Sequence, residues 1–202
     1  MSCSVGKMRI GAVILAAGAS SRFGSNKLLH KIWGKSLLEW SLKSIDIADI
    51  GIKIVVTSEG GKVDHLLDSR VTWLVNVNAG RGIGTSISLA TQFLEDQTDG
   101  ILFLLADQPK VLASDIDRLL LEFFKHPECV IASSVGNTIR NPIIFPSRLY
   151  GELKLLNDDR GARDVAKSHK EQLIRVKVSP EHLVDIDTVE DLERLEKKFE
   201  KK

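Results

Sequence analysis

The stretch VILAAGASSRFGSNKLL, residues 13–29, decides the fold. It begins as an apolar run suited to a buried strand, and it continues into a turn with Gly18 and Gly24 and two cations, Arg22 and Lys27. Glycine lets the backbone approach a ligand closely, and the free N–H groups of such a turn point at anions. The stretch therefore indicates a nucleoside triphosphate site, a dinucleotide site or an ordinary strand-to-helix connection.

The chain on either side of this stretch alternates between strand and helix patterns. Short apolar or β-branched runs predict strands over 9–16, 52–57, 71–75, 100–107 and 129–134. Helical spacing predicts helices over 36–45, 62–68, 83–96 and 113–125, the last capped by Ser114. This order favours an α/β fold with a doubly wound, mostly parallel sheet. Ligands of such sheets bind outside the carboxyl ends of the strands, here just after residues 16, 57, 75, 106 and 134.

The last third of the chain has a different character. Prolines flank the apolar run 140–146, which suits an edge strand or an inserted lobe. A helix start over 158–169, a half-exposed strand over 173–178 and a charged final helix capped by Thr188 follow. We expect a single domain over 1–202, with a nucleotide-binding half at 1–135 and a small C-terminal acceptor-binding lobe at 136–202.

Composition excludes several classes of protein. A formal net charge of +1 gives no global electrostatic reason to bind nucleic acid or an anionic membrane. The sequence has no apolar run of about 18 residues and no signal-peptide pattern, so we expect a cytoplasmic protein. Cys3 and Cys129 lie far apart and have no partner at metal-ligand spacing.

Two common phosphate-binding patterns do not fit the glycine turn. For a P-loop the span from Gly18 to Gly24 is one residue too long, and Ser25 stands where the lysine belongs. A G-x-G at Gly82 and Gly84 lacks the third glycine of the dinucleotide pattern. What remains is L-x-x-G-x-x-x-R-x-G-x-x-K, residues 15–27.

This pattern resembles the nucleotidyltransferase family that activates molybdopterin-type cofactors and sugar phosphates. The resemblance continues along nearly the whole chain. The segment from Asn76 through Gly82 to Ser86 is similar to the family's nucleotide-binding segment, and LLADQP, residues 104–109, to its metal-binding strand end. The motifs GAR at 161–163 and DIDTVEDL at 185–192 are similar to C-terminal signatures of molybdenum cofactor cytidylyltransferases. The resemblance implies a Rossmann-like nucleotidyltransferase fold.

The resemblance also implies a set of site residues. Catalytic roles fall to Arg22, Lys27 and Asp107; substrate binding to Leu15, Ala16, Ala17, Gly18, Asn76, Gly82, Ser86 and Arg163; and Mg2+ to Asp107 and Asp187. Asp185 competes with Asp187 for the second metal position, because residues two apart on a strand face the same side.

The chemistry explains why such residues are needed. An acceptor oxygen must attack the α-phosphorus of a triphosphate, and both reactants are anions, so positioning and charge neutralisation carry the catalysis. Lys27 and Arg22 supply positive charge. A phosphate monoester has a second pKa of about 6 and is largely dianionic near neutral pH, so it needs no general base.

The loop and the acceptor half suggest the two substrates. Relatives that use CTP carry LAAG, as residues 15–18 do here, and a side chain at Ala17 narrows the space for the base. Asn26 precedes the lysine where the methylerythritol cytidylyltransferases usually have proline. The implied acceptor is a phosphorylated pterin cofactor, with a molybdoenzyme or its chaperone as a further partner. The chain departs from the family at Asp158 and Arg140, where glycine is usual.

Three alternatives stay open on the sequence alone. The protein could use another nucleoside triphosphate or another phosphorylated acceptor. It could be a nucleotide-binding module without catalysis. It could also be a dinucleotide-dependent oxidoreductase.

Overall fold

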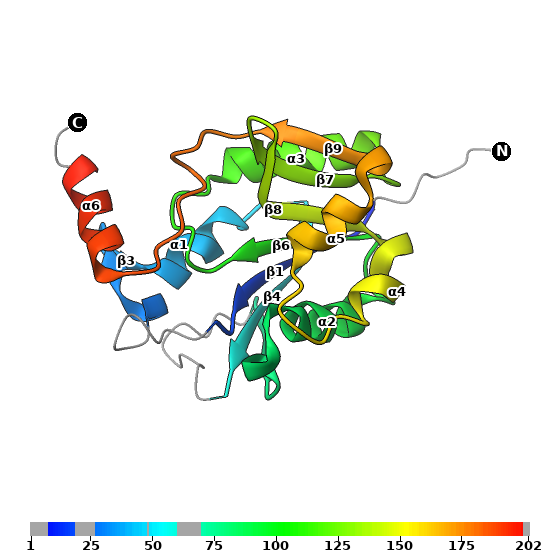
Figure 1. Ribbon diagram of the computed structural model, residues 1–202, viewed down its shortest axis with the longest axis horizontal. Helices are drawn as coiled ribbons and strands as arrows, with labels where there is room; N and C mark the ends of the chain where they lie inside the picture. Colours follow the sequence, from blue (N-terminus) through cyan, green and yellow to red (C-terminus); the bar gives the residue numbers. More distant parts are fainter. Residues whose placement is uncertain (1–7, 19–26, 48, 60–69, 200–202) are drawn as a thin grey trace.

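A seven-stranded sheet forms the centre of the molecule in the computed structural model, which describes residues 8–18, 27–47, 49–59 and 70–199 (Figure 1). Its spatial order is β5-β4-β1-β6-β8-β7-β9. The strands are β1 (Ile10–Ala16), β4 (Ile50–Ser58), β5 (Thr72–Asn76), β6 (Gly100–Leu105), β7 (Val130–Val135), β8 (Thr138–Pro146) and β9 (Leu173–Lys177). Only β8 runs antiparallel to its neighbours in this sheet. The predicted α/β, doubly wound, mostly parallel fold is confirmed.

The position of β8 corrects one expectation. The proline-flanked run over 140–146 belongs to a central strand between β6 and β7, and it is neither an edge strand nor an inserted lobe. Pro142 is accommodated by a break in the pairing with β7. Ala132 pairs with Ile143 while Ser133 pairs with Arg140, so the two residues between them, one of which is Pro142, bulge out of the ladder. A residue without a backbone N–H is tolerated at such a bulge.

Helices cover both faces of the sheet. They are α1 (Leu37–Ser44), α2 (Ile83–Leu94), α3 (Ala113–Lys125), α4 (Tyr150–Leu153), α5 (Ala162–Ser168) and α6 (Val189–Phe199), with 3-10 turns η1 (Lys27–Leu29), η3 (Ala79–Arg81), η4 (Ser147–Leu149) and η5 (Lys170–Gln172). Figure 1 shows α2, α4 and α5 on the near face and α1 and α3 on the far face. Successive residues of β1 alternate between two buried clusters, Ile14 facing α1 and α3, and Val13 facing α2.

A short hairpin and the last helix form a third, smaller core. The hairpin strands are β2 (Lys31–Ile32) and β3 (Lys35–Ser36), joined by a tight turn in which Trp33 and Gly34 both have positive φ. Helix α6 lies beside this hairpin (Figure 1), and Leu192 and Leu195 pack with Ile32 and Ile186. This packing brings the segment that precedes α6 close to the chain around Lys27.

Most helix limits agree with the sequence predictions, with one correction. Helix α3 begins at Ala113, so Ser114 lies inside its first turn and Leu112 takes the cap position. Leucine has no side-chain acceptor for the first turn, and the side-chain bond at this helix start runs the other way, from the Leu112 N–H to the Asp115 carboxylate at 3.2 Å. The predicted cap of α6 is present, since Thr188 Oγ1 accepts from the backbone N–H of Asp191 at 3.2 Å.

The helix predicted over 62–68 lies outside the described residues. Among the residues that the structure describes, no helix combines the length and the apolar character needed to cross a membrane.

Candidate active site

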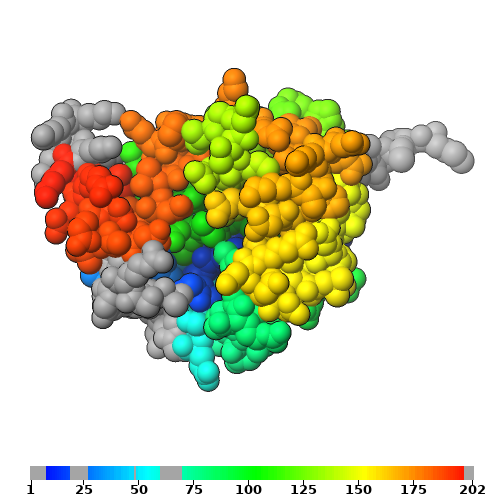
Figure 2. Space-filling view, viewed as in Figure 1, coloured from blue at the N-terminus to red at the C-terminus, as the bar shows by residue number. Residues whose placement is uncertain are grey.

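A cavity of about 410 Å3 opens at the carboxyl ends of β1 and β6. Figure 2 shows the hollow near the centre of the view, where blue and green residues lie beside the yellow segment around residue 155. Its walls come from the β1 end, the start of α2, the β6 end and the loop before α5; the lining residues are Leu15, Ala17, Gly18, Ala79, Gly80, Gly82, Ile83, Ser86, Leu105, Asp107 and Asp159. Its position is the one expected for the ligand of an open parallel sheet.

Lys27 reaches three oxygens beside this cavity. Its Nζ donates to Asp107 Oδ2 at 2.8 Å, to the Ile186 carbonyl at 3.0 Å and to Asp187 Oδ1 at 3.4 Å. The three acceptors lie 80 to 160 residues further along the chain. The Lys27 side chain is only 12% exposed. The structure therefore brings together three of the residues that the sequence singles out.

Asp107 is held in place by its backbone. Ala106 N–H donates to the Leu15 carbonyl at 3.1 Å, which extends the pairing of β1 and β6 by one residue. The Asp107 carbonyl accepts the Ile186 N–H at 3.0 Å. One carboxylate oxygen, Oδ1, is buried and has no hydrogen-bond partner among the described residues. Asp107 thus presents an unsatisfied oxygen in a part-buried position.

The two carboxylates that compete for the second metal position, Asp185 and Asp187, have different hydrogen-bond partners in the structure. Ile186 is fully buried in the core shared with α6. Asp187 pairs with Lys27, whereas Asp185 Oδ1 accepts from Gln108 Nε2 at 2.7 Å. Loss of water around the Asp185 carboxyl raises its pKa, and the nearby charges of Asp107 and Asp187 raise it further. The sequence could not separate the two, and the structure gives each a different partner.

The start of α2 forms the opposite wall. Asn76, at the end of β5, is buried, and its Nδ2 donates to Thr85 Oγ1 and to Ser86 Oγ, both at 2.8 Å. Its Oδ1 accepts the Asn78 N–H at 2.9 Å. Asn76 therefore fixes the first turn of α2 from behind, while Ser86 and Gly82 line the cavity.

A loop from the C-terminal part of the chain packs against this turn. Gly84 N–H donates to the Asp158 carbonyl at 2.9 Å. A Cβ on Gly82 would lie 2.4 Å from the Asp158 carbonyl carbon, and one on Gly84 would lie 2.7 Å from the Asp158 oxygen. The G-x-G in this segment therefore serves close packing of two backbones.

Some predicted residues do not line the cavity, and some residues that line it were not predicted. Ala16 is buried and does not line it, and Arg22 lies outside the described residues. Arg163 is exposed on the first turn of α5, and its charge acts to lower the pKa of Asp185. Sequence reasoning missed the wall residues Ala79, Gly80, Ile83, Leu105 and Asp159. Of these, only Asp159 has a sequence signal, because it lies in the motif that departs from the family pattern at residue 158.

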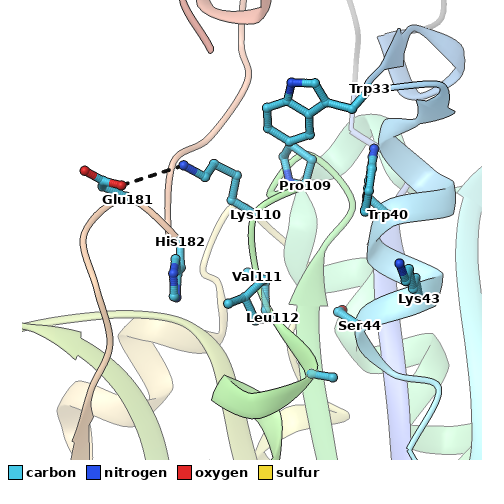
Figure 3. A pocket seen from close by; sticks show the side chains of 11 residues that line it. Trp33, Trp40, Lys43, Ser44, Pro109, Lys110, Val111, Leu112, Glu181 and His182 are labelled. Carbon is cyan, nitrogen blue, oxygen red and sulfur yellow. Dashed lines mark ion pairs between the residues drawn. The ribbon is translucent and has the colours of Figure 1, made fainter. Parts of the chain in front are cut away.

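A second cavity, of about 390 Å3, lies on the α1 and α3 side. Figure 3 shows Trp33 above Pro109, Lys43 and Ser44 on one side, and the ion pair of Lys110 with Glu181 on the other. None of the predicted site residues that the structure describes lines it. The described residues that the sequence predicts for the site thus line the first cavity and not the second.

The chain is similar to several known proteins. PucB of Bacillus subtilis, a purine catabolism protein, is 32% identical over 192 residues, which are 89% of this chain and 92% of PucB. A nucleotidyl transferase of Methanothermobacter thermautotrophicus has the same fold, with a TM-score of 0.81, 24% identity and coverage of 97% and 99% of the two chains.

A manganese complex of Rv0371c from Mycobacterium tuberculosis also shares the fold, with a TM-score of 0.77, 21% identity and coverage of 94% and 98%. The family described as the MobA-like NTP transferase domain matches residues 12–173. The chain therefore belongs to the MobA-like nucleotidyltransferases.

Proposed function

We propose that this nucleotidyltransferase transfers CMP from CTP to a phosphorylated molybdopterin-type cofactor in a Mg2+-dependent reaction that releases pyrophosphate. One observation carries the proposal: the Lys27 ammonium lies between Asp107 and Asp187 at the edge of a cavity bounded by Gly18 and the first turn of α2. This is the arrangement that a triphosphate with an accompanying cation requires.

The chain's groups suit the charge changes of the reaction. A phosphate oxygen of the acceptor forms a bond to the α-phosphorus, and the bond from that phosphorus to the oxygen bridging to the β-phosphate breaks, so pyrophosphate leaves with the electron pair. Lys27 supplies positive charge to the triphosphate, and Arg22 is proposed to do the same. The acceptor phosphate is already dianionic near neutral pH, so no proton has to be removed.

The residues present fit a divalent cation. Mg2+ prefers oxygen ligands and is usually bound by one or two carboxylates together with substrate phosphates. Asp107 Oδ1 has no hydrogen-bond partner in the part of the chain that the structure describes, and Asp187 is 56% exposed at its side chain. Asp107 and Asp187 would hold the ion, which when bound neutralises phosphate charge. The manganese complex of Rv0371c supports a divalent ion in this fold.

CTP is proposed as the nucleotide donor because of the side chains that line the cavity wall. Ala17 and Ile83 both line the cavity, and their side chains leave less room for a base than glycine would, which favours a pyrimidine. Leu15 and Gly18 line the same wall. Ala16 and Asn76 are proposed to act from behind it, by packing and by holding the turn.

The acceptor is proposed to enter from the C-terminal half. Arg163 lies near Asp185 on that side, and Arg140 stands on β8 next to the bulge. Both cations suit an anionic phosphorylated pterin. A molybdoenzyme or its chaperone would then receive the product.

Pyrophosphate release tests the proposal directly. The protein is mixed with Mg2+, a phosphorylated pterin acceptor and CTP, GTP, ATP or UTP in turn, and pyrophosphate is measured with a coupled assay. We expect the highest kcat/KM with CTP. A higher value with a purine nucleotide would overturn the base assignment. Binding of nucleotide without release of pyrophosphate, for any acceptor phosphate offered, would favour a non-catalytic binding module.

A further inference from the structure

The second cavity, beside α1 and α3, has the lining of a small-molecule site. Such sites are concave and mostly apolar or aromatic, and they carry a few polar groups that fix the orientation of the ligand. Here the lining combines two indoles, three apolar side chains and five polar ones, namely Trp33 and Trp40, Pro109, Val111 and Leu112, and Lys43, Ser44, Lys110, Glu181 and His182. Its volume of about 390 Å3 suits a ligand of one or two rings. The proposed nucleotidyl transfer uses none of these residues.

Two tryptophans form an aromatic corner of this cavity. The ring centroids of Trp33 and Trp40 lie 5.9 Å apart, and their planes meet at 77°. The orientation of Trp40 is fixed, because its Nε1 donates to the Ile32 carbonyl at 2.9 Å. Figure 3 shows Trp33 over Pro109 and next to Trp40. A flat ring placed in this corner can stack on one indole and meet the other edge to face, which are the two arrangements that aromatic pairs prefer.

The backbone at Trp33 is an unusual place for a bulky side chain. Trp33 is the first of the two turn residues in the β2–β3 hairpin, and its φ is 52°. Asparagine and glycine favour this conformation, whereas a bulky residue there is strained. Trp33 also packs against the small core beside α6, a role that an apolar side chain without this strain could fill. Since strain of this kind gathers at binding sites, it points to a role for the indole in the cavity.

The charged groups of the cavity favour an anion. Lys43 is exposed, and its Nζ lies 5.2 Å from the centroid of the Trp40 ring. Lys110 Nζ lies 3.9 Å from Glu181 Oε2, and the Glu181 side chain is 70% exposed. A long, exposed ion pair contributes little, so an anionic group of a ligand can replace Glu181 beside Lys110. Two lysines and one solvated carboxylate leave the mouth of the cavity positive.

His182 adds a polar group in a fixed orientation. Its Nδ1 lies 2.8 Å from Asp115 Oδ2, and Asp115 is buried in the first turn of α3. Asp115 is itself held by the Leu112 N–H at 3.2 Å. The other ring nitrogen of His182, Nε2, has no hydrogen bond within the described part of the chain. It is thus available to a polar atom of a ligand.

The second cavity is separate from the first, yet it is built on the same segments. The two cavities share no lining residue. The three segments that meet around the Lys27 ammonium all continue to the second cavity, where they contribute Trp33, Pro109 and His182. A ligand there would contact the segments that position the active site. Its binding can therefore change the affinity for nucleotide by a fixed factor without competition for one site.

We infer that the second cavity binds a planar aromatic acid of one or two rings, with the ring against Trp33 and Trp40 and the anionic group beside Lys110. The ligand is a small molecule distinct from the nucleotide. The inference goes beyond the proposed function, and it does not depend on which nucleotide or acceptor the enzyme uses.

The probe for the first test is 2-naphthoate, which is flat, has two fused rings and carries one carboxylate. It is titrated into the 15N-labelled full chain, and the indole N–H signals are followed by NMR. The chain has three tryptophans, of which Trp33 and Trp40 line the cavity and Trp73 lies on β5. We expect the signals of Trp33 and Trp40 to shift and saturate together while that of Trp73 stays in place. Single Trp→Phe variants assign the three signals.

Two related compounds test the chemistry of the ligand. 2-Naphthamide has the same rings without the charge, and cyclohexanecarboxylate has the charge without a flat ring. We expect the Kd of each to be at least about tenfold higher than that of 2-naphthoate, because each lacks one of the two features that the cavity recognises.

Variants at the charged end test the placement of the anionic group. Lys110→Met should raise the Kd for 2-naphthoate by about tenfold, and Glu181→Gln should lower it by about threefold, because Glu181 no longer competes for Lys110. Lys31→Met is the matched control, since Lys31 is exposed on β2, does not line the cavity and removes the same charge. Its Kd should stay within about twofold of the parent value. If Lys110→Met does not fold, as judged by circular dichroism, Lys110→Gln replaces it.

Three results of these titrations would overturn the inference. They are an absence of shifts at Trp33 and Trp40, equal affinity for 2-naphthoate and either related compound, and an equal loss of affinity in Lys31→Met, which would make the effect one of net charge.

A titration in the presence of Mg2+ and CTP tests whether the site is separate. A Kd for 2-naphthoate that is unchanged, or that changes to a plateau as CTP is added, supports the inference. A Kd that rises in proportion to the CTP concentration would show that the nucleotide occupies this cavity, and the inference would be wrong. None of these measurements needs turnover. Absent pyrophosphate release therefore leaves the inference standing, and absent binding of 2-naphthoate leaves the proposed function standing.

Discussion

Asp107 contributes to the site through two different parts of one residue. Its backbone carbonyl accepts from Ile186 and so positions the 185–187 segment, while its carboxylate accepts from Lys27. A substitution that changes only the carboxylate therefore tests its chemistry separately from its structural role.

Asp107→Asn should keep the fold and lose most turnover. Asparagine retains an oxygen that can accept from Lys27, and the backbone bond to Ile186 does not depend on the side chain. It lacks the negative charge that a divalent ion requires, so we expect kcat to fall by about 100-fold or more. Steady-state pyrophosphate release at saturating CTP measures this, with circular dichroism as the check on folding. Turnover equal to the parent's would show that Asp107 does not hold the ion.

Replacing Gly84 should lower the stability of the fold. In Gly84→Ala the new Cβ would lie 2.7 Å from the Asp158 oxygen and 2.9 Å from the Arg160 oxygen, both backbone atoms. The loop before α5 must then move away from α2. We expect a loss of about 1–3 kcal/mol in the free energy of unfolding, measured by urea denaturation.

Gly80→Ala is the matched control for this substitution. Gly80 lines the same cavity, and a Cβ there would meet nothing within 4 Å. Its stability should remain within about 0.5 kcal/mol of the parent value. If both variants unfold at the same urea concentration, the close approach at Gly84 does not contribute to stability.

At the scale of elements, helix α1 begins with a complete capping box. Ser36 Oγ accepts from the Glu39 N–H at 3.2 Å, and Glu39 Oε2 accepts from the Ser36 N–H at 2.7 Å. This second bond, to the Ser36 backbone, is the main reason why the pKa of Glu39 lies below its ordinary value of 4.5. A lowered folded-state pKa adds stability above the unfolded pKa, and that stability is lost as the pH falls through the folded pKa.

Glu39→Gln should therefore lower stability at pH 7 and not at pH 3. Because Glu39 is largely solvated, the gap at pH 7 and low salt should be about 0.3–1 kcal/mol. Urea denaturation of parent and variant at both pH values measures it. Ser36→Ala should cost about 1 kcal/mol at pH 7 and keep most of that cost at pH 3, because the bond from the Glu39 N–H to the cap oxygen is lost at both pH values. A Glu39→Gln gap that is the same at both pH values would contradict the role of the charge.

The elements themselves were largely predictable, since each depends on local pattern. The apolar runs of β1 and β6 and the helical spacing of α2 gave their type and place correctly. The predicted cap of α3 was wrong because the helix begins one residue before Ser114, and the Asp115 carboxylate bonds to the backbone N–H of the cap residue Leu112. The place of β8 was also wrong, because the bulge that hides Pro142 depends on a partner strand and leaves no mark in the local sequence.

At the scale of the molecule, the chemistry of the site depends on contacts across the whole chain. Lys27 and Asp187 are 160 residues apart, and they meet where Ile186 bonds to the Asp107 carbonyl and α6 packs on the β2–β3 hairpin. The sequence predicted the residue types of the candidate site and its place at the carboxyl ends of the strands. Which of Asp185 and Asp187 faces Lys27 was not predictable, because residues 184–187 form no strand and the two carboxylates take different partners, Lys27 for Asp187 and Gln108 for Asp185. The missed walls around Gly80 and Asp159 likewise come from loops that fold over the cavity.

The strand order also argues that the chain folds as a single unit. Strand β7 ends at Val135, yet its two neighbours in the sheet, β8 and β9, both come from later residues. Strand β6 also loses its neighbour β8 when the chain is cut there. A fragment of residues 1–135 would thus contain β7 with no strand beside it and an open apolar edge at β6.

We therefore predict that the fragment 1–135 shows no cooperative unfolding, although it contains every residue proposed to bind the triphosphate. Residues 1–202 should unfold in one sharp transition, and co-expression of 1–135 with 136–202 should restore that transition, because β8 can then pair with both β6 and β7. Thermal denaturation followed by circular dichroism measures all three samples. A sharp transition in the isolated fragment would mean that the two halves are separate domains, and that the sheet closes without the strand that now lies at its centre.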